Sequence, residues 1–226
     1  MRSDFVKGIR LSLQRIFRVL PQWTLPVALV AVAITIGTVE IYPANPASQR
    51  TNEGALNGQV GATKSGGEVV PPQSSTVYVL FSSVMQGGSF SHANDVDTAG
   101  GQFRWQLNNL LDKNKELKSL EKSARQNPRP EAANQIAAYY LQSVDDALAQ
   151  VRNWLTKHPD RAWQMKTVEP DGKGSWSAEG LKAGGYEVVV RGKLSGYDAD
   201  WEASVDLAPG RVISLPLTQP RFFRHE

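Results

Sequence analysis

The chain has 226 residues, no cysteine and a formal net charge of +3. Without cysteine it has no disulfide scaffold, no cysteine-ligated zinc, no thiol catalysis and no lipid anchor on a cysteine. Residues 1–22 hold five bases and one acid, which leaves a net charge of −1 for the rest of the chain. We see no basic stripe in this near-neutral remainder and expect no nucleic-acid partner.

The most apolar stretch of the chain runs from Trp23 to Tyr42, and its one charge is Glu40 near the end. Roughly 20 residues of α-helix cover the roughly 30 Å hydrocarbon layer of a bilayer. Trp23 and Tyr42 lie at the two edges, where amphipathic rings favour the headgroup level, and Pro26 marks a break or a kink. We predict one transmembrane helix at 23–42, with Trp23, Pro26 and Tyr42 as anchor residues.

Residues 1–22 form a short basic tail before this span. Because basic flanks stay in the cytoplasm, we expect the tail to face the inner leaflet, and the C-terminal part to be periplasmic or otherwise extracytoplasmic. The apolar spacing in the tail fits either an amphipathic helix on the membrane surface or a continuation of the span. The topology-setting bases are Arg2, Lys7, Arg10, Arg15 and Arg18.

The end of the apolar run bears on whether it is removed as a signal peptide. The residues around Ala44 and Ala47 do not match a small-x-small cleavage pattern. This favours an uncleaved, single-pass signal-anchor in the cell inner membrane over a cleaved signal peptide.

Residues 43–75 are dominated by Gly, Pro and small polar residues, and we predict a flexible linker there. The β-branched and aromatic run at 76–85 predicts a buried strand. A Gly-rich loop follows, in which His92, Asp95 and Asp97 are close in sequence. Since the loop lacks the Gly and closing Glu of a calcium hand, we interpret it as a solvated loop and expect no metal.

Residues 102–157 are predicted to form a helical hairpin, with helices at 102–125 and 130–157 separated by a Pro-containing break. The second helix has a heptad-like seam of apolar residues. This seam fits packing on the partner helix and sheet, and the alternative is self-association of the chain. The seam residues are Ala137, Leu141, Val144, Leu148, Val151 and Leu155.

From 161 to 217 apolar and polar residues alternate with a period of two, and turn residues separate the runs. Tyr186, Val188 and Val190 form one such face. Several short strands at this spacing predict an antiparallel sandwich. The C-terminal tail, 220–226, holds Phe222 and Phe223, which fit either a docking peptide or an end that packs on the sheet.

Within this region the runs DGKGSWSAEGLKAGGYEVVVRG and WEASVDLAPGRVISLPL resemble the carboxypeptidase regulatory-like (transthyretin-like) β-sandwich domain. Leu181, Gly184 or Gly185, and Tyr186 fit the family's Leu-x-x-Gly-x-Tyr corner, and Gly210 fits its last turn. The resemblance covers 163–217, about a quarter of the chain, and implies a non-catalytic sandwich. The family's opening strand is missing directly before it, and 76–85 is the candidate to supply it.

Together these features predict an α+β fold: one membrane helix, a linker, and an exported domain at 76–219 in which the hairpin is inserted within the sandwich. The histidines are far apart, and the adjacent Asp145 and Asp146 point in different directions on a helix. The sequence also lacks the common hydrolase, zinc-protease and nucleotide-binding motifs. We therefore expect no enzyme activity and no cofactor.

Two functions of different classes remain. The first is a membrane-anchored structural or protein-interaction module, an accessory subunit or tether of a membrane or envelope complex. The alternative is a membrane-anchored module for carbohydrate or cell wall. In that case Trp163, Trp176 and Trp201 would form a stacking platform for polysaccharide. Buried rings would count against the alternative.

Overall fold

The structure is a computed structural model that describes residues 53–64, 66–83, 96–127 and 129–221. At 41–42, 85–86, 89–90 and 222–223 it describes the backbone alone. The basic tail and residues 23–40 of the predicted span lie outside the described residues. Within the described part, none of the helices combines the length and the apolar character needed to cross a membrane.

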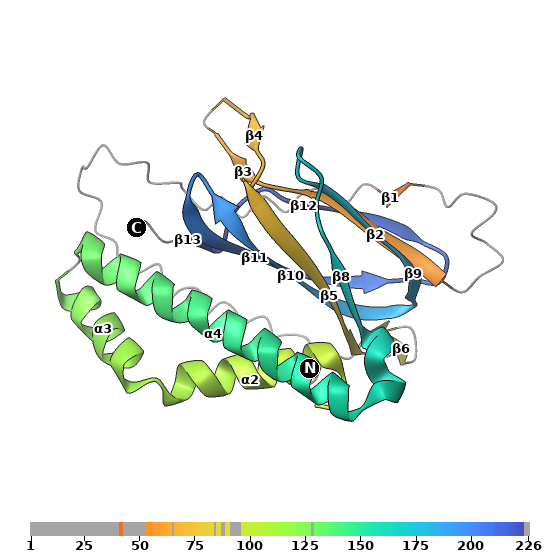
Figure 1. The fold of residues 1–226 in the computed structure, drawn as a ribbon, viewed down its shortest axis with the longest axis horizontal. Helices are drawn as coiled ribbons and strands as arrows, with labels where there is room; N and C mark the ends of the chain where they lie inside the picture. Colours follow the sequence, from red (N-terminus) through yellow and green to blue (C-terminus); the bar gives the residue numbers. More distant parts are fainter. Residues whose placement is uncertain are drawn as a thin grey trace.

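The fold is α+β and has three layers (Figure 1). One layer is a four-stranded sheet with the strand order β1 (Ile41–Tyr42), β12 (Val212–Leu217), β2 (Glu53–Val60) and β9 (Ser175–Lys182). The middle layer is a five-stranded sheet with the order β13 (Phe222–Phe223), β11 (Tyr197–Leu207), β10 (Gly184–Leu194), β5 (Ser74–Ser83) and β8 (Met165–Val168). The third layer is helical and contains α2 (Ala99–Lys113), α3 (Lys115–Gln126) and α4 (Pro130–Lys157).

Shorter elements complete the described chain. Two small hairpins pair β3 (Ala62–Thr63) with β4 (Val69–Val70) and β6 (Met85–Gln86) with β7 (Ser89–Phe90). A 3₁₀ helix, η2 (Pro159–Gln164), leads from α4 into β8. The strand predicted at 76–85 is present as β5, and the helical layer follows it in the chain before β8 returns to the same sheet.

Side chains on both faces of β10 are buried. Successive side chains of a strand point to opposite faces of the sheet, so β10 contributes to the core on each side. Val188 and Val190 face the core between the two sheets, whereas Val189 packs with Leu80 beneath the helices. Trp201 of β11 closes the inner core: it is 1% exposed, and its indole N–H donates to the Gly61 carbonyl at 2.8 Å. The two cores therefore share one sheet.

The helices begin and end at identifiable caps. The Thr98 hydroxyl accepts from Gly101 N–H and donates to the Ser82 carbonyl, each at 3.1 Å, which fixes the start of α2 on β5. Asn114 ends α2, and its side chain accepts from Leu117 N–H at 2.9 Å to begin α3. The predicted helix at 102–125 is thus two helices, because an Asn at this point caps the second one.

The heptad-like seam of α4 packs inside the chain. All six seam residues are buried, and Val144, Leu148 and Val151 contact the helix-facing side of the sheet and α2. The interpretation that the seam packs on its own hairpin and sheet is confirmed. Self-association through the same seam would need this core to open.

The predicted linker at 43–75 is wrong for residues 53–75. These residues form β2, β3, β4 and the start of β5, and Leu56 and Val60 are fully buried. The glycines suggested flexibility, but here they allow close approach of strands. A Cβ on Gly58 would lie 2.1 Å from the Leu215 carbonyl oxygen, and one on Gly54 would lie 2.4 Å from the Arg211 carbonyl oxygen.

Two further sequence predictions need correction. β2 lies between β12 and β9 and pairs with β12 in parallel, so the sandwich is not wholly antiparallel. β2, the strand that forms this parallel pair, belongs to the region predicted as a linker. In addition, Ile41 and Tyr42 pair with Ile213 and Val212 as a strand, so the last two residues of the predicted span are extended and not helical.

We predict that Gly58→Ala destabilises the folded region by about 1–3 kcal/mol, because its methyl group has no room between β12 and β9. Gly66→Ala is the matched control, since a Cβ there meets nothing within 4 Å. Urea unfolding followed by tryptophan fluorescence measures both. Equal stability of the two variants would contradict the placement of β2 inside the sandwich.

Candidate functional site

The predicted tryptophan platform does not form. Trp176 and Trp201 are 5% and 1% exposed and belong to the core between the sheets. Trp163 is 44% exposed but lies in η2 and not on a strand. Its ring centroid is 4.9 Å from that of Phe81, and Lys182 Nζ lies 3.8 Å from the ring. Because two of the three rings are buried, the alternative of a tryptophan stacking platform is not supported.

The other predicted contact residues are placed only in part. The backbone of Phe222 pairs with Asp200 and that of Phe223 with Ala199, so both belong to edge strand β13. Their side chains lie outside the described residues, as do the anchor residues Trp23 and Pro26 and the five bases of the tail. Of His92, Asp95 and Asp97 in the Gly-rich loop, only Asp97 is among the described residues. Its carboxylate forms an ion pair with Arg161 at 3.4 Å.

The corner residues quoted for the family resemblance hold the connection between the two sheets. Leu181 and Tyr186 are buried, and the Tyr186 hydroxyl donates to the Lys182 carbonyl at 2.7 Å. A Cβ on Gly184 would lie 2.4 Å from the Phe81 ring. Gly210 has a φ of 65°, a conformation that favours glycine.

Charged residues fix the helices on the sheet. Arg104 of α2 donates to Glu187 and, at 2.8 Å, to Ser204, so the pair is anchored on both β10 and β11. Arg191 donates to the two carboxylate oxygens of Asp145 at 2.7 and 3.0 Å. Burial alone lowers the pKa of Arg191, but its hydrogen bonds to Asp145 and the nearby acids outweigh this and raise it.

Asp145 is therefore a structural ion-pair partner. Its neighbour Asp146 instead accepts from Gln142 at 2.9 Å, so the two carboxylates point in different directions, as the helical spacing predicted.

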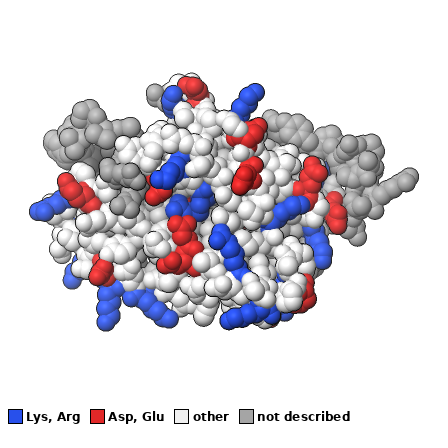
Figure 2. Space-filling view, viewed as in Figure 1, with Lys and Arg blue, Asp and Glu red and all other residues white. Residues whose placement is uncertain are grey.

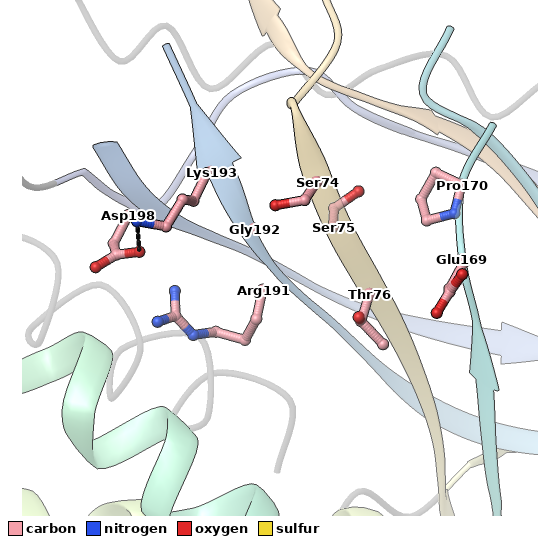
Figure 3. A pocket seen from close by; sticks show the side chains of 9 residues that line it. All are labelled: Ser74, Ser75, Thr76, Glu169, Pro170, Arg191, Gly192, Lys193 and Asp198. Carbon is pink, nitrogen blue, oxygen red and sulfur yellow. Dashed lines mark ion pairs between the residues drawn. The ribbon is translucent and has the colours of Figure 1, made fainter. Parts of the chain in front are cut away.

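A polar hollow of about 450 Å³ opens at one end of the five-stranded sheet (Figure 3). Ser74, Ser75 and Thr76 of β5 line one part of it, with the Ser74 and Ser75 hydroxyls pointing in opposite directions, and Glu169 and Pro170 line another. Lys193 and Asp198 close it with a weak ion pair of 3.9 Å. Among the described residues no aromatic ring lines this hollow, so these residues offer hydrogen bonds and charge rather than stacking.

A second, open groove of about 670 Å³ runs between α3 and α4. Its lining combines apolar Leu120 and Ala138 with polar Ser119, Gln135 and Gln142. The hairpin beside it is held by two tyrosines of α4: the Tyr139 hydroxyl donates to Glu116, and the Tyr140 hydroxyl donates to Glu121 at 3.1 Å.

The outer face of α3 carries bases that sequence analysis did not recognise as a set. Lys115, Lys118, Lys122 and Arg125 are all exposed, and we call them the α3 stripe. In the sequence they are mixed with Glu116 and Glu121, which suggested an ordinary charged surface. The structure turns these two acids toward α4, so the expectation of no basic stripe was wrong for this helix.

No family model matches the chain, and no curated protein matches it either. The family resemblance therefore rests on the corner residues alone. Among solved structures, a Pseudomonas aeruginosa protein proposed to bind carbohydrate matches 78% of this chain and 99% of its own length, with 11% identity and a TM-score of 0.36.

The pilus backbone protein RrgB of Streptococcus pneumoniae matches 74% of this chain and 41% of its own length, with 9% identity and a TM-score of 0.28. Its full-length structure matches 73% of this chain and 30% of its own length, with 8% identity and a TM-score of 0.27.

The Tyr140–Glu121 bond predicts a pH dependence. Burial, reinforced by Glu121, raises the pKa of Tyr140 to about 12 from 10.0. The unfolded chain releases this proton at lower pH than the folded chain, so the contribution to stability is complete below pH 10 and is lost between pH 10 and 12.

We therefore expect the free energy of unfolding to fall less steeply across this window in Tyr140→Phe than in the unmodified chain. Urea unfolding at several pH values measures it. Tyr197→Phe is the control, and an identical slope in Tyr140→Phe and the unmodified chain would contradict the assignment.

Proposed function

We propose that the chain is a membrane-anchored, non-catalytic interaction module, and that the α3–α4 hairpin is the part that meets its partner. The predicted span at 23–42 would supply the anchor, shortened by the two residues of β1. Because β1 already pairs with β12, the folded region would begin directly at the membrane. The remaining segment, 43–52, lies outside the described residues.

The observation that carries this proposal is the open groove between α3 and α4. α3 packs against α4, and Leu117 is its buried residue, whereas Leu120 is partly exposed in the groove. The rest of the helical layer is committed to the sheet core through α2 and the seam of α4. A groove with an apolar floor and polar walls suits a protein segment, such as an amphipathic helix.

The double variant Ser119→Arg/Gln135→Arg tests this function. Both residues are exposed on the groove walls, so the fold has room for the longer side chains while the groove is blocked. We expect the full-length variant, affinity-purified from membranes in mild detergent, to recover at least tenfold less of any stoichiometric partner protein than the unmodified chain does.

Ala149→Arg/Asn153→Arg is the matched control, with the same charge change on an exposed part of α4 outside the groove. Equal partner recovery from the groove variant and the unmodified chain would overturn the hairpin as the docking element. If the chain purifies without any partner, the interaction function itself fails.

Carbohydrate binding is a second candidate, and the polar hollow is the observation that favours it. Its lining combines hydroxyl side chains with the carboxylates of Glu169 and Asp198, and these groups offer the donors and acceptors that sugar hydroxyl groups need. The sugar would then bind where β5 begins and β10 ends, and not on the tryptophans. The ligand class that fits is a neutral oligosaccharide, since the hollow has no excess of bases.

The double variant Glu169→Gln/Ser74→Ala tests the sugar site with N-acetylglucosamine oligomers in isothermal titration calorimetry. Removing one carboxylate charge and one hydroxyl from the hollow should weaken binding about thirtyfold, at roughly 1 kcal/mol for each of the two lost hydrogen bonds. Glu179→Gln/Ser177→Ala on β9 is the control. No binding by the unmodified chain, or equal binding by the hollow variant, removes this candidate.

A further inference from the structure

The four bases of the α3 stripe lie on one side of the helix, although they are separated in the sequence. Successive residues of an α-helix are about 100° apart around its axis, so positions 115, 118, 122 and 125 fall within an arc of about 80°. Leu117, which is buried, and Leu120, which lines the groove, lie on the other side of the helix. The stripe extends over about 15 Å along the axis. Figure 2 shows Lys and Arg side chains along the lower-left outline, where Figure 1 has α3.

The acids of α3 neutralise this stripe only in part, because the helix has four bases and two acids. Glu116 and Glu121 are held by tyrosine hydroxyls at the seam with α4. Asp112 approaches Lys118 at 3.6 Å, but both side chains are more than half exposed, so this pair is weak in water. Lys115, Lys122 and Arg125 form no ion pair with the described residues. The stripe therefore presents net positive charge to solvent.

We propose that the α3 stripe docks an acidic segment of a partner protein. The inference rests on the proposed interaction function and deepens it by naming the chemistry of the partner. Four bases at three- and four-residue spacing match acids at the same spacing on a facing helix, as charged pairs do between helices of a coiled coil. The stripe has neither a concave floor nor aromatic rings, so charge selects the partner.

The position of α3 argues against the anchoring bilayer as the occupant. β1, where the chain would arrive from the predicted span, lies at the upper right of Figure 1, and α3 lies at the lower left, at the other end of the molecule. The short length of the stripe argues for a short acidic segment, because a long polyanion would need bases beyond one helix. An acidic protein segment satisfies both conditions.

Fluorescence anisotropy with a labelled short poly-L-glutamate peptide, about as long as α3, tests the proposal on the full-length chain in nonionic detergent. We expect binding at 50 mM salt that weakens at least about tenfold at 500 mM, because salt screens exposed charges. The quadruple variant Lys115→Gln/Lys118→Gln/Lys122→Gln/Arg125→Gln should weaken binding by a similar factor. Circular dichroism confirms that the helices remain.

The matched control is Lys64→Gln/Lys157→Gln/Lys173→Gln/Arg211→Gln, which removes four exposed bases outside α3. Equal loss in this control would show general charge attraction and overturn the proposal. So would absence of poly-L-glutamate binding, or stripe-dependent binding to phosphatidylglycerol vesicles that exceeds it. Ser119→Arg/Gln135→Arg should keep poly-L-glutamate binding, so failure of the groove and failure of the stripe are told apart.

Discussion

The structure depends on one strand that is buried on both of its faces. β10 gives Val188 and Val190 to the core between the sheets and Val189 to the core beneath the helices. Its neighbours β5 and β11 are paired with it along almost their whole lengths. Removing the helices would expose one apolar face of this sheet, and removing the four-stranded sheet would expose the other. The hydrophobic effect therefore joins the three layers into one unit.

Polar contacts set the alignment of that unit. Two arginines join the helices to the sheet. Arg104 of α2 pairs with Glu187 of β10, which is largely shielded from water. Arg191 of β10 pairs with Asp145 of α4, which is about half exposed. A charge left without its partner at such a place is costly, so these pairs favour one register of helices over sheet. The same arrangement keeps Asp145 in a structural role, although two adjacent aspartates on a helix invite a catalytic interpretation.

Alternation and helical periodicity predicted the strand at 76–85, the strands from 161 onward and the seam of α4, because burial of one face leaves a direct pattern in the sequence. The strands of the last region begin at 165, since 159–164 form a 3₁₀ helix. These patterns failed where contact partners are remote. The glycines of β2 indicated a linker, because nothing local reveals that Gly58 faces a carbonyl of β12. The face of α3 was missed for a related reason: its acids bind tyrosines that lie more than 15 positions away. The tryptophan platform was only an alternative, and Trp201 belongs to the inner core.

The helical layer has one part that is packed into the core and one part that is largely exposed. α2 and most of α4 are committed to the core, whereas α3 buries one residue and is held by α4. Docking a partner on α3 thus leaves the sheet core undisturbed. The polar hollow at the sheet end is a separate surface, formed by strand ends that the helices leave uncovered.

Native-state amide hydrogen exchange on the full-length chain tests this division most directly. The account predicts that amides of β2, β5, β10, α2 and the second half of α4 exchange through one common opening of the highest free energy. Amides of α3 should exchange through a smaller, local opening. Independent exchange of α2 and α4 at much lower free energy than the sheet, or unprotected amides at 54–60, would contradict a single three-layer unit.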